Sequence, residues 1–309
     1  MCGPPGGEFP SADRGPSPNG RRVTVDLEFA ARNLLNGATI SVLLILLSLG
    51  LSVIYGLMKM LNMAHGEFFI LGAFSVLLLM RLKIGFWLGV ALAPVIMGVF
   101  GLLVYKVLFK SLYGKPTATI LATWGLSMII RQSLQITMGA RPHVVENPFP
   151  GAVSLLGVQY PAYRVFIIAA GTLLILTIVW LYLRTTFGLQ IRAAIHNREL
   201  TSALGINTER INTFSFVIGS ALAGLAGALL APLIPVGPLT GLSYLIKVFF
   251  VIIVGGAGSL IGTVVGGLVI GGGESLLQLF LSPLGAEIAI LVLAVVLISL
   301  RPSGLVGQR

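Results

Sequence analysis

The sequence predicts an all-α, polytopic integral membrane protein with about eight transmembrane helices, some of them broken or short and rich in glycine. Two observations predict this class. Apolar residues make up 56% of the chain and charged residues only 10%, too few charges to solvate the surface of an ordinary soluble domain. Long stretches, such as 33–58, 84–105, 165–183 and 211–246, carry no charge at all, and a helix needs about 20 apolar residues to cross the hydrocarbon core.

The net charge of +10 does not indicate nucleic acid binding. The basic residues are scattered through short connecting loops and do not gather on one face with interleaved aromatic residues. Cationic loops beside membrane spans are expected from anionic lipid headgroups and the positive-inside bias. We therefore expect a lipid bilayer as the partner and no nucleic acid. The single cysteine, Cys2, excludes an internal disulfide and a cysteine cluster for zinc.

Residues 1–30 are rich in Pro, Gly and Ser and contain no apolar run, so we expect a disordered tail, or a wrongly chosen start codon, and not a signal peptide. Residues 31–309 are expected to form one transmembrane domain. Spans are expected at about 37–58, 66–81, 84–105, 117–138, 163–183 and 211–231, in two shorter glycine-rich segments at 243–256 and 259–279, and at 286–300.

A polar segment, about 184–210, separates the spans at 163–183 and 211–231. If this segment and the C-terminus lie in the cytoplasm and an odd number of spans comes before the segment, the N-terminus lies outside. The resulting excess of basic residues on the cytoplasmic side is slight, so the charges determine the orientation only weakly.

Small residues follow one face of two predicted spans. Gly219, Ala223 and Gly227 recur at intervals of four, and Gly262 and Gly266 form a GxxxG pattern. Close helix packing in a bilayer needs small residues, so we expect helix–helix contacts there. The alternative is that glycine is simply common in membrane helices.

The stretch LNMAHGEFFILGAF, residues 61–74, places Asn62, His65, Gly66 and Glu67 between apolar segments. Titratable groups at membrane depth are costly and usually face cavities or partners; Arg131, Lys247, Glu274 and Glu287 are further candidates of this kind. Gly66 suggests a break between two helical pieces, with Glu67 at a helix N-terminus, and broken helices can line a solute path. The alternative is that His65 and Glu67 cap a helix at the membrane interface.

A second candidate region is the loop 191–214. Asn197, Arg198 and Glu199 are predicted to begin a short polar helix that Gly205 ends. Such a helix either docks into a groove of a soluble partner or lies on the lipid surface; the residues alone leave both open.

The sequence contains no Ser/His/Asp pattern, P-loop or HExxH motif, and His65, His143 and His196 lie far apart. We therefore expect no catalytic residues, no metal and no cofactor, and a protein that is not an enzyme. Uphill transport would need an ion gradient or a partner. An ion-driven secondary transporter, with Glu67 or Glu274 carrying the proton, is thus an alternative.

Several long motifs resemble a known family. GLSVIYGLMKMLNMAHGEFFILGAF, RAAIHNRELTSALGINTERINTFSFVIGSALAGLAGALL, VIIVGGAGSLIGTVVGGLVIG and RPSGLVG are similar, in this order, to branched-chain amino-acid permeases of bacterial ABC importers. The resemblance runs from about residue 36 to the end. LYGKPTATILATWGLSMIIRQ and GPLTGLSYLIKVFFVIIVGG are also similar to permeases for urea and short-chain amides, although Lys247 departs from that pattern.

The resemblance implies a permease subunit in the bacterial inner membrane that pairs with a second, related permease, with two cytoplasmic ATPases that use the ATP and an extracytoplasmic solute-binding protein. It implies a coupling helix at about 192–205 that sits on the ATPase, with Arg192, Ala193, Asn197, Glu199 and Gly205 in the coupling loop. It also implies that Asn62, His65, Gly66 and Glu67 line the solute path.

Overall fold

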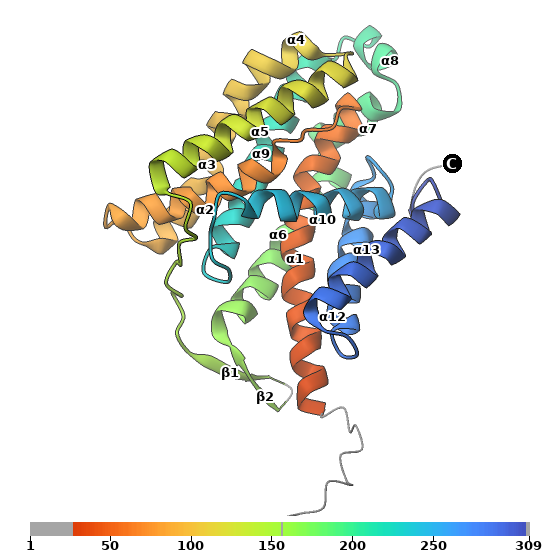
Figure 1. Ribbon diagram of the computed structural model, residues 1–309. Coiled ribbons are helices and arrows are strands. Elements are labelled where there is room, and N and C mark those ends of the chain that lie inside the picture. The colour runs from red at the N-terminus through yellow and green to blue at the C-terminus, as the bar shows by residue number, and fades with distance from the viewer. Residues whose placement is uncertain (1–26, 156, 307–309) are drawn as a thin grey trace, which may run out of the picture.

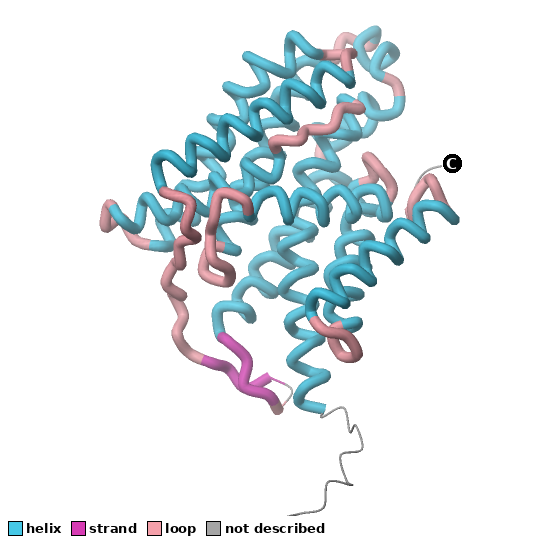
Figure 2. The backbone as a smooth tube through the Cα atoms, viewed as in Figure 1, coloured by secondary structure: helices cyan, strands magenta, loops and turns pink. Residues whose placement is uncertain are grey.

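The computed structural model describes residues 27–155 and 157–306 (Figure 1). Of the predicted tail, residues 1–26 lie outside this description. Residues 27–30 form the first turn of α1 (Leu27–Met58), so this helix begins inside the predicted tail and ahead of the first predicted span. Helices make up most of the described chain (Figure 2). The prediction of an all-α membrane fold is confirmed.

Helix α1 runs through the middle of the molecule (Figure 1). In its most apolar stretch 83% of the residues are buried, against 17% in α6 (Ala162–Arg184) and in α13 (Pro283–Leu300). With 32 residues, α1 is about 48 Å long and therefore longer than the ~30 Å hydrocarbon core. It contacts α6, α9 (Thr208–Leu230) and α10 (Thr240–Gly255). The apolar helices α6 and α13 are thus mostly uncovered by protein, and their outer surfaces are available to lipid.

The remaining helices follow the predicted segments closely. They are α2 (His65–Arg81), α3 (Phe86–Val104), which continues through a π-helical turn (Tyr105–Phe109) into α4 (Lys110–Leu112), α5 (Pro116–Met138), and α11 (Leu260–Gly267), which continues through a second π-helical turn (Leu268–Gly272) into α12 (Gly273–Leu277). Six helices of the described chain are long and apolar enough to cross a membrane, so the predicted number of eight is not confirmed.

Three of the predicted spans fall outside those six for different reasons. With 17 and 16 residues, α2 and α10 are shorter than a full span. Helix α5 is long enough, with 23 residues, but its threonine, serine and glutamine side chains make it less apolar. When a helix is long enough to span the membrane but has a lower hydropathy, one of its faces meets something other than lipid tails.

The loop between α5 and α6 contains a small antiparallel hairpin that the sequence analysis missed. Strand β1 (Ala152–Leu155) pairs with β2 (Val158–Pro161), with Ala152 opposite Pro161. The Tyr160 hydroxyl donates to Asn36 Oδ1 at 3.0 Å, which fixes the hairpin to the first half of α1.

Glycines lie where helices cross closely. Gly219 of α9 faces Gly50 of α1, and a methyl group added to either would collide with the backbone carbonyl of the other. Ala223 is completely buried, and a methyl on Gly227 would collide with the carbonyl of Phe69 in α2. Such backbone approach is how helices associate in a bilayer.

The second predicted glycine pair lies between α10 and α11. Gly262 faces Gly255, and a side chain on Gly266 would collide with the carbonyl of Val251. The two helices therefore meet backbone to backbone, and the loop between them contains only four residues, 256–259.

Candidate functional site

The segment between α1 and α2 returns into the protein before α2 begins. Residues 59–64 are not helical, and His65, the first residue of α2, contacts Leu47, eleven residues before the end of α1. At 1.5 Å per residue, that point lies about 16 Å back along α1. The interruption between the two helices therefore lies at residues 59–64. The predicted break at Gly66 is wrong, because Gly66 lies within the first turn of α2.

The polar residues of this segment are buried. Asn62 and His65 are 0% exposed and Glu67 is 1% exposed. Asn62 Oδ1 accepts a hydrogen bond from the backbone N–H of Ala64 at 3.0 Å, which shapes the turn into α2. In the single chain these side chains do not reach an open surface. Irregular backbone of this kind is tolerated in a bilayer only when it is enclosed by protein or faces water.

His65 ties this segment to α1. Its Nε2 lies 3.0 Å from the Leu47 carbonyl oxygen, and because a carbonyl only accepts, Nε2 carries the hydrogen. The other ring nitrogen, Nδ1, is buried without a hydrogen-bond partner among the described residues. The imidazole therefore serves as a cross-link between the start of α2 and the middle of α1.

Glu67 is part of a charged cluster between α2 and α5. Its Oε1 accepts from Ser127 Oγ at 2.9 Å and lies 3.2 Å from Arg131 Nε. Arg131 Nη2 also donates to Ser127 Oγ at 3.1 Å. Glu67 Oε2 has no hydrogen-bond partner among the described residues. Glu67 and Arg131 are separate candidates in the sequence, and the fold brings them together.

A row of hydroxyl groups on α5 completes this cluster. Thr119, Thr123 and Ser127 are all buried and lie four residues apart, so they share one helix face. Thr123 Oγ1 accepts from the backbone N–H of Met63 at 3.1 Å, which supports the irregular segment directly. This row was not among the predicted site residues; its signal in the sequence is the spacing of four, which ends at Arg131.

The N-termini of α2 and α10 meet beside Glu67. A methyl group on Gly66 would collide with the carbonyl of Gly241, and one on Gly241 would approach Glu67 Oε2 within 3.1 Å. Both helices point the positive ends of their dipoles toward this place, which favours the Glu67 carboxylate. Gly66 is needed for this close approach.

A second ion cluster joins α10, α12 and α13. Lys247 Nζ donates to both carboxylate oxygens of Glu274 at 3.0 Å and lies 3.2 Å from Glu287 Oε1. The side chains of Lys247 and Glu274 are largely buried, whereas that of Glu287 is 40% exposed. All three candidates are therefore one network, separate from the cluster at Glu67.

The predicted coupling helix is two helices. Helix α7 (Thr186–His196) and α8 (Arg198–Ala203) are separated at Asn197, whose Oδ1 caps α8 by accepting from the Leu200 N–H at 2.9 Å. A continuous helix over 192–205 is therefore wrong, whereas the short helix predicted to begin at Asn197, Arg198 and Glu199 is confirmed as α8. Gly205 has a φ of +80°, a conformation that suits glycine, and it ends α8 as expected.

The named residues of this loop have different environments. Arg192 donates to the carbonyls of Tyr182 and Leu183, and its guanidinium stacks over the Tyr182 ring, so it fixes α7 to the end of α6. Ala193 is half-buried and Glu199 is exposed. Two leucines of this loop carry no signal in the sequence: Leu200 in α8 and Leu204 directly after it are 59% and 72% exposed. They give α8 and its C-terminal end an apolar outer surface.

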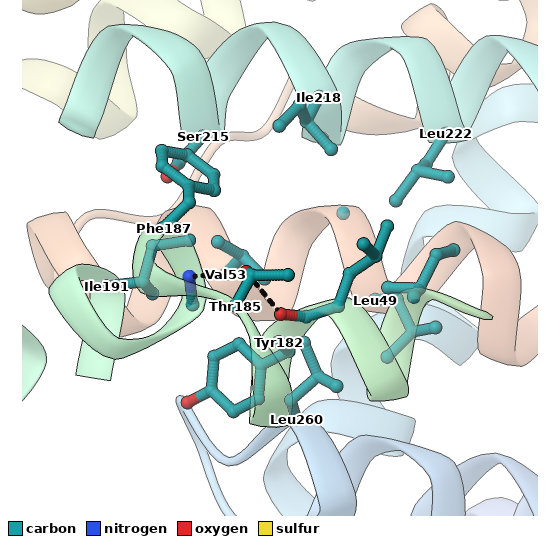
Figure 3. A pocket seen from close by; sticks show the side chains of 15 residues that line it. Leu49, Val53, Tyr182, Thr185, Phe187, Ile191, Ser215, Ile218, Leu222 and Leu260 are labelled. Carbon is teal, nitrogen blue, oxygen red and sulfur yellow. Dashed lines mark hydrogen bonds between the residues drawn. The ribbon is translucent and has the colours of Figure 1, made fainter. Parts of the chain in front are cut away.

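An apolar cavity of about 320 Å³ lies between α1, α6, α7 and α9 (Figure 3). Figure 3 shows Phe187 and Ile191 of α7 at one end and Leu49 and Val53 of α1 along one side. None of Asn62, His65 and Glu67 lines it. Its walls offer almost no polar surface, so this cavity gives no partner to a charged or polar solute.

Among the described residues, no group of three or more His, Cys, Asp or Glu side chains could hold a metal ion. The fold and its buried polar clusters define a class: a multi-pass membrane protein of the transporter type, with an irregular, polar segment enclosed among its helices.

Residues 33–300 match the family described as "Branched-chain amino acid transport system / permease component". The chain belongs to this family, so it is a membrane permease and not an enzyme. The resemblance noted in the sequence is thus confirmed. No solved structure is a significant match to the chain.

Three curated relatives illustrate the similarity. The chain is 29% identical over 299 residues to the high-affinity branched-chain amino acid transport system permease protein LivH of Escherichia coli, covering 90% of this chain and 95% of the relative. It is 29% identical over 295 residues to a probable branched-chain amino acid transport permease protein LivH of Methanocaldococcus jannaschii, covering 91% and 94%. It is 28% identical over 221 residues to the permease protein LivM of Salmonella typhimurium, covering 63% of this chain and 51% of the relative.

Proposed function

We propose that this chain is the permease subunit that forms part of the path for branched-chain amino acids in an ABC importer of the bacterial inner membrane, powered by separate ATPase subunits. The observation that carries the proposal is the family match over nearly all of the membrane-embedded chain, together with relatives described as branched-chain amino acid permeases. The urea and short-amide alternative rests on sequence motifs alone.

The assembly contains a second, related permease, two cytoplasmic ATPases and an extracytoplasmic solute-binding protein. The similarity to LivM, itself described as a permease of such a system, supports pairing between two related permeases. Two identical copies are the alternative arrangement, and subunit stoichiometry in the purified complex distinguishes them.

The ATPases dock on the segment 184–210. Leu200 and Leu204 present apolar side chains outward, and exposed apolar residues on a short helix are suited to a groove on a soluble partner. Arg192 anchors α7 to α6, so a push on α8 is passed to the membrane helices. The helix at the lipid surface, the alternative left open by the sequence, would instead place Leu200 and Leu204 in the headgroup region.

The solute path runs beside the charged cluster of Glu67, Ser127 and Arg131. The predicted path residues Asn62, His65, Gly66 and Glu67 are enclosed in the single chain. In the charged cluster, Arg131 reaches further toward the surface than Glu67, with 14% of its side chain exposed against 1%. The enclosed residues hold the irregular segment and Arg131 in place, while the surface beyond Arg131 faces the path.

Uptake in proteoliposomes tests the function. The complete assembly with its binding protein is expected to accumulate leucine, isoleucine and valine inside the vesicles. This uptake requires ATP on the side of the membrane that carries the ATPase subunits. Accumulation of urea instead would support the urea alternative. Uptake of leucine by this chain alone, driven by a pH gradient and without ATPases, would support the ion-driven alternative and contradict the proposal.

A further inference from the structure

Arg131 uses only one side of its guanidinium within the chain. Nε lies 3.2 Å from Glu67 Oε1, and Nη2 donates to Ser127 Oγ at 3.1 Å. No described residue accepts a hydrogen bond from Nη1, and the side chain is partly exposed. The outer edge of the guanidinium, formed by Nη1 and the second hydrogen of Nη2, is therefore available.

Apolar surface adjoins this free edge. Trp124 and Met128 come seven and three residues before Arg131 on α5, and both are exposed, by 45% and 56%. The Trp124 ring centre lies 6.0 Å from the Arg131 guanidinium carbon. The neighbouring Gly125 has open space around it. A cation and an apolar surface thus lie side by side on the outer face of α5.

We propose that Arg131 binds the carboxylate of the amino acid as it passes through the membrane, with Trp124 and Met128 contacting its apolar side chain. A guanidinium edge with two N–H groups matches a carboxylate in a bidentate manner. The inference rests on the proposed function and adds a residue and a chemical requirement to it: the solute needs a carboxylate. Urea has no carboxylate and therefore cannot form this bidentate contact with Arg131.

Glu67 and Ser127 are positioning residues in this arrangement. They hold the inner edge of the guanidinium, and Glu67 balances its charge, so the site carries no net charge before the solute arrives. Balanced charge keeps the affinity low. A path needs binding strong enough to admit the solute and weak enough to release it.

Alkylation of a cysteine introduced next to Arg131 tests directly whether leucine occupies the site. The complete assembly is prepared with two substitutions in this chain: Cys2→Ser removes its only cysteine, and Met128→Cys introduces the one to be alkylated. Leucine in the millimolar range is expected to slow alkylation of residue 128 by about threefold or more, the effect of occupying most sites. Leucinamide, which lacks the carboxylate, and urea are expected to have no effect. Equal protection by leucinamide, or no protection by leucine, overturns the proposal.

The double variant Glu67→Gln/Arg131→Gln removes the guanidinium without leaving a buried, unpaired charge. It is expected to assemble, to abolish the protection by leucine, and to lower ATP-driven leucine uptake roughly tenfold to hundredfold, as expected when a charge-assisted contact is lost. Arg131→Lys keeps the charge but loses the bidentate edge, and intermediate uptake is expected. Arg141→Gln, which removes an exposed cation nearby in the sequence, is the matched control and should keep uptake within about twofold.

Three further outcomes are decisive. If the double variant fails to retain the second permease on purification, the guanidinium binds a carboxylate of that subunit, and the proposal is wrong. If the unmodified assembly imports leucine but the double variant does so equally well, only the role of Arg131 fails. If the unmodified assembly does not import leucine at all, the proposed function itself fails.

Discussion

Glu67 Oε1 lies 3.2 Å from Arg131 Nε, so an ion pair joins the first turn of α2 to the second half of α5. The carboxylate is almost completely enclosed, while the guanidinium reaches the surface. Removing one member of such a pair leaves a buried charge without a partner, whereas removing both leaves none. Comparing single with double substitutions of this pair therefore separates its effect on stability from its effect on solute binding.

Glu67→Ala is expected to destabilise the protein by about 3–5 kcal/mol, because it removes the carboxylate that Arg131 and Ser127 contact. Glu67→Gln in combination with Arg131→Gln should cost clearly less. Thermal unfolding of the detergent-solubilised chain measures the difference. Glu28→Gln is the control, since Glu28 pairs with Arg32 at an exposed site and should cost less than about 1 kcal/mol. Equal melting temperatures for Glu67→Ala and the control would contradict this prediction.

Gly66→Ala should separate the N-termini of α2 and α10, because its methyl group would collide with the carbonyl of Gly241. Both folding yield and leucine uptake are expected to fall, with a stability loss of about 1–3 kcal/mol from overpacking. The matched control is Gly125→Ala in α5, where a methyl group meets open space and alanine should be neutral or stabilise the helix by up to about 1 kcal/mol. Size-exclusion profiles and melting curves report both effects. Indistinguishable profiles for the two variants would rule out a tight contact at Gly66.

The sequence predicted the helical segments well because each depends on local composition. Uncharged apolar runs identified α6 and α9 to within a few residues. The position of the interruption between α1 and α2 was less predictable. Gly66 looked like the place where a helix bends, but its role is close approach to Gly241, and that contact depends on a partner distant in sequence.

The polar clusters show the same limit. Composition alone identified Glu67, Arg131, Lys247, Glu274 and Glu287 as unusual residues in an apolar chain. Their sorting into two separate networks depends on tertiary packing. The row of hydroxyls on α5 could have been found from its spacing of four, whereas the hairpin at 152–161 and the cavity beside α7 carried no comparable local signal.

Leu204→Asp is expected to weaken binding of the ATPase subunits by about tenfold or more, because it places a charge on the apolar outer surface of α8. Membrane insertion and thermal stability of the chain should not change, since Leu204 is 72% exposed. Co-purification of the ATPases measures the effect. Val144→Asp, equally exposed but in the loop between α5 and α6, serves as the control. Normal ATPase retention by Leu204→Asp would show that α8 does not dock on that partner.

Lys247→Met should destabilise the protein more than any change to its two partners. It leaves Glu274 buried without a cation and Glu287 close by, which is expected to cost about 3–5 kcal/mol. Glu287→Gln should cost about 1 kcal/mol or less, because that side chain is 40% exposed and water can replace the contact. Adding Glu274→Gln to Lys247→Met should recover part of the loss by removing the unpaired carboxylate. Melting curves of the three variants and the unmodified protein give the order directly. If Glu287→Gln were the most damaging, the network would depend on its exposed member, and Lys247 would not be its centre.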